Sequence, residues 1–413
     1  MRSRRSALAN QLRAVAAFVV ASLVLVVGSL VPAHTAGAVA APRASQGSVA
    51  YHGGPVEHSS AVFVIFWAPA GYAFPSGYTA LVARYFADVA HDSYLASNVY
   101  SVPTQYYNGS GTAKKFESYN VSLKAVVVDT QAYPKNGCKN YTLGDGSKSS
   151  VCLTHAQIQT KLKAVIADKH FPTGLATNYF LFTPQGVASC NTAITDPSSG
   201  GCYNPLQYNG YCAYHSHLGS GVNAVIYAHL PYAALAGCTS GQSPNGNAAD
   251  AVLNNAAHEH NESMADPLGN AWYDNNGHEI ADKCHLMFGV PLGATSFGQY
   301  NQFINGDPYW LQELWSNRAN ACVQRNTFPQ PSASFTYTPS KPLHGKPVRF
   351  TSSVKEAGVS KFAFKWTFPD GATSTAKHVV HTFAGFIFSG VVTLVVTDPH
   401  GGQARSVRYI TVS

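Results

Sequence analysis

The chain has 413 residues and a formal net charge of +7, four units of which come from arginines in its first 13 residues. The remaining charge of about +3 is small, and no basic cluster is interleaved with aromatic side chains, so no nucleic-acid partner is expected. The length allows two or three domains.

The first 40 residues have the pattern of a signal peptide. Basic residues such as Arg4 and Arg5 precede an apolar run at 14–31, and small residues at 36–40 offer cleavage sites. The run is also long enough to be an uncleaved membrane anchor, but the small residues favour cleavage. We therefore expect a secreted, extracellular protein with no transmembrane segment after residues 1–40 are removed.

Eight cysteines follow this segment, and none of them forms a C-x-x-C pair. The spacing argues against a zinc ribbon or a thioredoxin-like redox site. An even number of cysteines in an exported chain instead favours four disulfides. Sequence does not fix their connectivity. The simplest pairing is sequential, and it joins Cys284 to Cys322.

Residues 41–325 alternate between strand-like and helix-like segments. Short apolar runs rich in β-branched residues predict strands at 61–67, 121–128, 178–183 and 222–229. Apolar residues at helical spacing predict helices at 78–89 and 154–170. The pattern predicts a mixed α/β domain of the α+β class.

A third predicted helix, within residues 248–266, carries His258, Glu259 and Glu262 in the pattern H-E-x-x-E. It stops before Pro267, because a residue before proline disfavours the helical conformation. His258 and Glu262 are four residues apart and share one helix face. The pattern differs by one residue from H-E-x-x-H, in which two histidines hold zinc and the glutamate activates water. The alternative is a solvated, charged helix face.

Acidic residues are concentrated around this helix, since eight of the twenty in the chain fall between residues 250 and 307. Glu279 and Asp282 are three residues apart, a spacing that one side of a short helix presents. We predict Glu279 as the third metal ligand and Asp282 as the partner that orients His258, with the reverse assignment open. Asp266 is a further possibility, but it lies about 12 Å from His258 along a continuous helix axis.

These ligands predict Zn²⁺, with Glu259 as the general base that takes a proton from water. One imidazole nitrogen and two carboxylates form a harder ligand set than the two histidines and one glutamate of many zinc enzymes. Manganese, iron and calcium are therefore alternative ions.

Five further histidines bear on this site. His260 points away from the metal-binding face, about 200° round the helix, and is expected on the surface. His278 and His285 flank the acidic pair, where a structural hydrogen bond is a more common role than stabilising an oxyanion. His215 and His217 alternate on one strand face, from which they can approach the site.

The composition changes at residues 326–332, where two prolines mark a linker. Beyond it, strand patterns at 333–337, 347–351, 362–366 and 391–396 are separated by short turns. They predict an all-β, immunoglobulin-like sandwich over residues 333–413, with Trp366 in its core.

The segments F-K-W-T-F-P-D-G, H-T-F-A-G and V-T-L-V-V-T-D-P-H-G-G resemble a PKD domain. Pro369-Asp370-Gly371 replaces the usual G-D-G turn. The resemblance covers all of residues 333–413 and implies a spacer, or a contact for proteins and glycans, without catalysis.

The larger region resembles the Exordium (phosphate-induced protein) family and its bacterial relatives. Its matching segments are Y-H-G-G-P-V, L-T-H-A-Q-I-Q, Y-C-A-Y-H-S-H, H-E-H-N-E, D-P-L-G-N-A-W-Y-D and E-I-A-D-K-C. The resemblance implies a secreted protein associated with the cell wall, and it implies no particular reaction. Plant members tend to have Asn-Pro where this chain has Asp266-Pro267, which weakens Asp266 as an essential ligand.

We therefore predict a secreted metal-dependent hydrolase, most simply a zinc metallopeptidase, with a zincin-like domain at residues 41–325. Glu279, seventeen residues after Glu262, resembles the downstream third ligand of zinc proteases. The alternative is a non-catalytic binding protein of the cell surface or wall, with a glycan partner and a structural metal or acidic cluster. Glu259 separates the two hypotheses, because a closed structural site has no use for a base.

Overall fold

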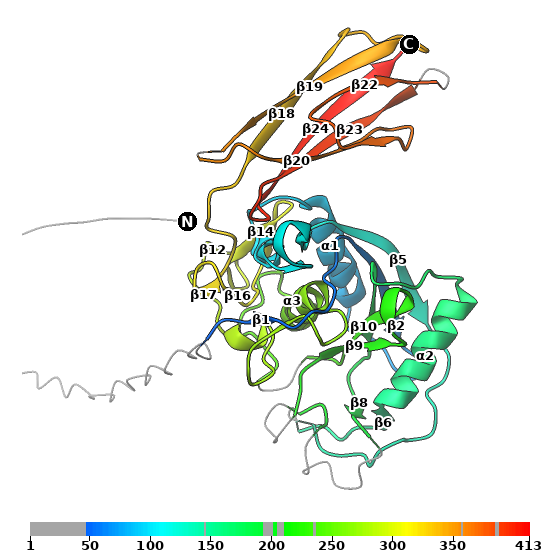
Figure 1. The fold of residues 1–413 in the computed structure, drawn as a ribbon. Helices are drawn as coiled ribbons and strands as arrows, with labels where there is room; N and C mark the ends of the chain where they lie inside the picture. The colour runs from blue at the N-terminus through cyan, green and yellow to red at the C-terminus, as the bar shows by residue number, and fades with distance from the viewer. Residues whose placement is uncertain are drawn as a thin grey trace, which may run out of the picture. The chain divides into compact units, whose positions relative to one another are not determined.

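The computed structural model describes residues 47–143, 146–192, 201–204, 210–233, 237–356, 358–384 and 388–413 (Figure 1). The predicted signal peptide at residues 1–40 lies outside them. The described chain is mostly β, with three α-helices and many small sheets. No helix in these described ranges is long and apolar enough to span a membrane.

The largest sheet of residues 47–325 has five strands in the order β5-β2-β7-β10-β9. Their bounds are Val121–Asp129, Ser60–Trp67, Thr177–Phe182, Val225–Leu230 and Tyr214–Leu218. The first four run parallel to one another, whereas β9 is an edge strand antiparallel to β10. The four predicted strands overlap β2, β5, β7 and β10; β10 begins three residues later than predicted, because residues 221–223 form a 3₁₀ turn.

Helices cover both faces of this sheet. Because side chains alternate along a strand, Val62, Val64 and Phe66 of β2 share a core with α1 (Tyr78–His91) and α3 (Ala249–Ala265). Phe63 and Ile65 face the other way and pack with α2 (His155–Asp168). Coverage of both faces explains why the parallel strands read as continuous apolar runs.

Short sequence signals set the bounds of α2 and α3. α2 begins with a capping box in which the Thr154 hydroxyl accepts from the Gln157 N–H and the Gln157 side chain accepts from the Thr154 N–H. α3 begins after Asn247, whose side chain accepts from the Ala249 N–H. It ends at Ala265, as the following Asp266-Pro267 pair predicts.

Pairs of very short strands and single 3₁₀ turns connect these elements. The two-stranded sheets are β1 (Ala50–Tyr51) with β11 (Trp272–Tyr273), β3 (Tyr107–Asn108) with β4 (Lys115–Phe116), β6 (Val151–Thr154) with β8 (Val187–Cys190), β12 (Gly293–Ala294) with β13 (Gln299–Tyr300), β14 (Gln302–Ile304) with β15 (Asp307–Tyr309), and β16 (Leu314–Ser316) with β17 (Ala321–Val323). The 3₁₀ turns are η1 (Val99–Ser101), η2 (Pro103–Gln105), η3 (Gly111–Ala113), η5 (Gly221–Asn223) and η6 (Asp282–Cys284). The sequence did not predict these pieces, because two or three residues are too few to show a period.

The C-terminal strands form a β-sandwich. One sheet contains β18 (Ser332–Thr338), β19 (Pro347–Lys355) and β22 (His378–Thr382); the other contains β21 (Thr373–Ser374), β20 (Ala363–Thr367), β23 (Phe388–Thr397) and β24 (Gln403–Val412). All pairings are antiparallel. Trp366 is fully buried between Phe335 and Phe350. The predicted sandwich and its core tryptophan are confirmed, and the linker at 326–332 stays a prediction.

All eight cysteines are paired sequentially. The disulfides are Cys138–Cys152, Cys190–Cys202, Cys212–Cys238 and Cys284–Cys322. The predicted number and the simplest predicted connectivity are both confirmed. The last bridge ties η6, which begins at Asp282 and follows Glu279, to β17.

Candidate metal centre

The helix α3 carries the H-E-x-x-E pattern inside the protein rather than on its surface. Glu259 is 6% exposed and Glu262 is 2% exposed. Burying two carboxyl groups one turn apart is costly unless partners compensate their charge. The alternative of a solvated, charged helix face is therefore wrong for this helix.

Glu262 joins α3 to the segment that carries the acidic pair. Its Oε1 accepts the N–H of Ala281 at 3.1 Å and that of Asp282 at 2.9 Å. The Glu279 N–H in turn donates to Oδ2 of Asp282 at 3.2 Å. These bonds hold the start of η6 against the helix and leave Oε2 of Glu262 to face the neighbouring imidazoles.

His258 meets both carboxylates that the sequence analysis assigned to it. Its Nε2 lies 3.1 Å from Oε2 of Glu262 and 3.5 Å from Oδ1 of Asp282. Its Nδ1 lies 3.3 Å from Oε1 of Gln312, whose amide also donates to the Ala281 carbonyl at 2.8 Å. An Nδ1–H donated to Gln312 leaves the Nε2 lone pair free for a metal.

His215 adds a second imidazole to the cluster. It lies on the edge strand β9, and its Nε2 lies 2.9 Å from Oε2 of Glu279 and 3.7 Å from Oε2 of Glu262. The sequence analysis placed His215 within reach but did not choose it as a ligand. Alternation on a strand was the available signal, and it cannot show which other segment a strand faces.

The other histidines have separate positions. His260 is fully buried, so its expected surface position is wrong; its ring lies 2.8 Å from the Ser60 hydroxyl and 3.2 Å from that of Tyr100. It does point away from the metal-binding face, but α3 is covered on that side too. His278 is half-exposed beside Asp274, and His217 contacts the carbonyl of Gly219.

Asp266 lies beside the cluster with one oxygen already bonded. Its Oδ1 accepts the N–H groups of Asn270 at 2.6 Å and Ala271 at 2.7 Å. These bonds shape the turn after α3. Asp266 is fully buried, so its carboxyl group is not available to solvent.

The cluster shifts the pKa values of its members. Burial alone would lower the pKa of His215, but Glu279 and Glu262 outweigh it and raise the pKa to about 10. For His258, Glu262 and Glu259 likewise overcome burial and raise the pKa well above 6.5. Burial raises the pKa of Glu259 to about 7, against the opposing effect of His258. His215 and His258 therefore carry positive charge that balances the carboxylates when no cation is bound.

A pocket of about 220 Å³ opens over His258, Glu259 and Asp282. Residues 210–213 and His285 also line it. The volume is large enough for several water molecules. Glu259 and His258 therefore line one space that has room for water.

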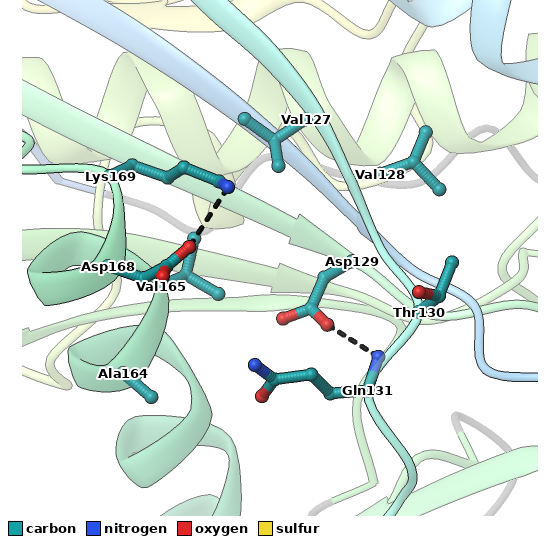
Figure 2. Close-up of a pocket in the computed structure, with 9 residues that line it drawn as sticks. All are labelled: Val127, Val128, Asp129, Thr130, Gln131, Ala164, Val165, Asp168 and Lys169. Atoms are coloured by element: carbon teal, nitrogen blue, oxygen red, sulfur yellow. Dashed lines mark hydrogen bonds and ion pairs between the residues drawn. The ribbon is translucent and has the colours of Figure 1, made fainter.

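Figure 2 shows a different pocket, of about 180 Å³, between the end of β5 and the last turns of α2. Its Asp129 is paired with Lys161 at 3.0 Å, and Asp168 is paired with Lys169 at 2.9 Å. The residues that line it include no histidine, cysteine or glutamate. This pocket carries no set of catalytic groups comparable to the cluster on α3.

The donor atoms around Glu262 fit a divalent metal ion. A tetrahedral Zn²⁺ bound at 2.0–2.1 Å keeps its ligand atoms roughly 3.3 Å apart. Oε2 of Glu262 lies 3.1 Å from Nε2 of His258 and 3.7 Å from Nε2 of His215. Nε2 of His258 lies 3.5 Å from Oδ1 of Asp282. Of the predicted ligands, His258, Glu262 and Asp282 bring their donor atoms together in one group. Glu279 belongs to a second group, with His215 and Glu262.

Comparison with known proteins finds a relative that carries the name of the Exordium family, which the sequence motifs resemble. No family model matches the sequence. The chain is similar to Protein EXORDIUM-like 3 of Arabidopsis thaliana, with 30% identity over 201 residues. The match covers 42% of this chain and 58% of the plant protein, which is less than two thirds of its length.

Solved structures of β-sandwich modules are similar to about a fifth of the chain. The PKD1 domain of the Vibrio cholerae metalloprotease PrtV is 25% identical, covers 20% of this chain and 98% of that chain, and has a TM-score of 0.18. The PKD domain of an M14-like peptidase from a Thermoplasmatales archaeon is 16% identical, covers 21% and 98%, and has a TM-score of 0.18. A structure of carbohydrate-binding modules from the beta-sandwich superfamily is 26% identical, covers 20% and 34%, and has a TM-score of 0.19.

Proposed function

We propose that the protein is a secreted, metal-dependent hydrolase that cleaves peptide bonds. Residues 41–325 form its zincin-like domain, and residues 333–413 form a spacer of the PKD type. One observation carries the proposal: the side chains of Glu259, His258 and Asp282 line the same pocket. A base beside an open metal position is what hydrolysis needs, whereas a structural site is closed.

The residues that would hold the metal are His215, His258, Glu262, Glu279 and Asp282. Bound there, Zn²⁺ would act as a Lewis acid on a carbonyl oxygen and make water more acidic. The second imidazole, from His215, makes the ligand set softer than the sequence analysis expected. That change favours Zn²⁺ over calcium or manganese.

Glu259 is the group that handles protons in this proposal. Its carboxylate takes a proton from a water molecule in the pocket as the water oxygen bonds to the substrate carbonyl carbon. The carbon–nitrogen bond then breaks, and Glu259 passes the same proton to the departing amine. His285 lines the same pocket, where a ring N–H can donate to the carbonyl oxygen.

The edge strand β9 supports a peptide as the substrate. β9 is the last strand of the sheet, antiparallel to β10, and it carries His215. An extended peptide can add to such an edge through backbone hydrogen bonds. A peptide paired along β9 would run beside the imidazole that belongs to the metal cluster.

The four disulfides support an extracellular location, because such bridges persist in oxidising compartments. Removal of a signal peptide at residues 1–40 is part of the proposal. The partners are peptides or glycans at a cell surface or wall, and the sandwich takes no part in catalysis.

The test combines metal analysis with a hydrolysis screen. The purified protein is loaded with Zn²⁺, and its metal content and its activity on a broad peptide library are measured. Activity that a chelator removes and added Zn²⁺ restores supports the hydrolase. Bound metal without hydrolysis of peptides or glycans supports the alternative, a binding protein with a structural metal. A protein that takes up no metal contradicts the proposal.

A further inference from the structure

The donor atoms of the cluster divide into two groups of three. His215, Glu262 and Glu279 form one group, and His258, Glu262 and Asp282 form the other. Within each group the donor atoms lie within 4.8 Å of one another. Among the residues that the structure describes, these two groups share Glu262 and no other member. We propose that the centre holds two divalent cations per chain, bridged by the Glu262 carboxylate, an inference that rests on the proposed metal site.

The orientation of Glu262 suits a bridge. Its Oε1 is occupied by two backbone N–H groups, from Ala281 and Asp282. Its Oε2 is the atom that approaches both imidazoles, His258 at 3.1 Å and His215 at 3.7 Å. One oxygen held between two donor groups can bind an ion of each group, and paired ions in hydrolases lie about 3.5–4 Å apart.

Asp266 gives independent support for an ion in the His215 group. It is fully buried, and its Oδ2 has no hydrogen-bond partner within the described part of the chain. Its charge acts on both His215 and Glu279, so it lies beside that group. A buried carboxylate oxygen without a partner is costly, and a cation would compensate it.

The sequence analysis set Asp266 aside as a ligand of an ion shared with His258. The helix α3 is continuous to Ala265, so that separation along the axis remains. Asp266 leaves the helix with φ −148° and ψ 63°, and it therefore bears on the His215 group and not on the His258 group.

Charge balance also favours two ions over one. Glu259, Glu262, Asp266, Glu279 and Asp282 contribute five negative charges when ionised, and two divalent cations contribute four positive charges. With neutral histidine ligands, one cation would leave three of these negative charges without compensation, and all of these residues except Asp282 are buried or nearly buried. Uncompensated buried charge is among the most costly features a fold can contain.

The two groups differ in exposure, which assigns them different roles. The side chains of His215 and Glu279 are 11% and 17% exposed, whereas that of Asp282 is 42% exposed. The His258 group lines the pocket together with Glu259. The ion in the His215 group is therefore the enclosed one, and the ion in the His258 group has the open position that faces substrate.

The experiment counts ions in the full-length protein. The metal-free chain is loaded with Zn²⁺, freed of excess metal and weighed by native mass spectrometry. We expect two Zn²⁺ per chain in the wild type and in the control His217→Gln, since His217 lies on the same strand outside both groups. We expect one Zn²⁺ in His215→Gln, in Glu279→Gln and in His258→Gln.

A second readout does not depend on how well the variants fold. Two bridged Mn²⁺ ions in the wild type give a spin-coupled electron paramagnetic resonance spectrum, and one isolated ion does not. A wild type with one Zn²⁺ and an uncoupled Mn²⁺ spectrum overturns the two-ion inference and leaves the metallohydrolase proposal standing. A wild type that binds no metal overturns both.

Discussion

The Nε2 of His215 lies 2.9 Å from Oε2 of Glu279, although 64 positions separate them in the chain. The contact joins the edge strand β9 to the segment that η6 continues, and Glu262 of α3 touches both. Three separate parts of the fold therefore supply the metal cluster. The helix α3 packs against β9 and β10, and the Cys284–Cys322 bridge joins η6 to β17.

We predict that Gln312→Leu lowers the affinity for Zn²⁺ roughly 10- to 100-fold, the range typical of groups that orient a metal ligand. Gln312 lies 3.3 Å from Nδ1 of His258 and also binds the Ala281 carbonyl. Without it, the imidazole loses the bond that fixes its tautomer and its direction. Competition with a chromophoric chelator measures the affinity.

The matched control is Gln159→Leu, which removes a hydrogen bond to Tyr227 from α2, on the opposite face of the sheet. Its Zn²⁺ affinity should equal that of the wild type. If Gln312→Leu and Gln159→Leu bind Zn²⁺ equally well, Gln312 does not position His258.

We predict that the double variant Cys284→Ser/Cys322→Ser loses about 4 kcal/mol of unfolding free energy, from the chain entropy that the bridge removes from the unfolded state. The bridge spans 38 positions, compared with 12 for Cys190–Cys202, whose removal should cost about 3 kcal/mol. Urea unfolding in the presence of a chelator compares the two.

The variant Cys284→Ser/Cys322→Ser should also bind Zn²⁺ more weakly, because Cys284 ends the turn that carries Asp282. Unchanged affinity would show that η6 keeps its place without the bridge.

A buried carboxyl outside the cluster predicts the pH dependence of stability. Glu117 is fully buried, and both of its oxygens lack a hydrogen-bond partner among the residues described. Burial, with a contribution from Glu57, raises its pKa well above 4.5. An acid with a raised folded-state pKa contributes stability that is fully present below about pH 4.5 and is lost as the pH rises through the folded-state value.

The variant Glu117→Gln should therefore unfold at higher urea than the wild type at pH 8 and lose this advantage towards pH 4. The gain is about 1.4 kcal/mol for each unit by which the pKa is raised. The control Asp168→Asn changes an exposed carboxylate whose pKa is lowered by Lys169, and its urea midpoint should stay close to that of the wild type at both pH values. Stability curves of Glu117→Gln and wild type that stay parallel from pH 4 to 8 would refute this account of Glu117.

The elements that were predicted correctly are those long enough to carry a signal of their own. The strand β2 is an eight-residue run that is almost entirely apolar, and the helix α3 is a 17-residue segment that stops before Asp266-Pro267. Sequential pairing of the cysteines was also correct, because each bridge closes a local loop. The two-stranded sheets between residues 293 and 323 were missed, since their strands have only two or three residues.

The site was predicted in part for a similar reason. His258 and Glu262 share one helix, so their proximity follows from helix geometry. The position of His215 opposite Glu279 depends on which strand forms the edge of the sheet, and no local pattern contains that information. The burial of His260 depends on the covering of the second side of α3, which likewise is a tertiary property.

The most direct test of the central claim is the peptidase activity of Glu259→Gln, measured on the Zn²⁺-loaded protein with its metal content determined in the same sample. Loss of a general base should lower kcat roughly 10²- to 10⁴-fold, with metal content unchanged, because Glu259 belongs to neither ligand group. The control Glu313→Gln changes a half-buried glutamate that does not line the pocket, and it should keep wild-type activity. A Glu259→Gln enzyme that is fully metallated and as active as the wild type would contradict the claim.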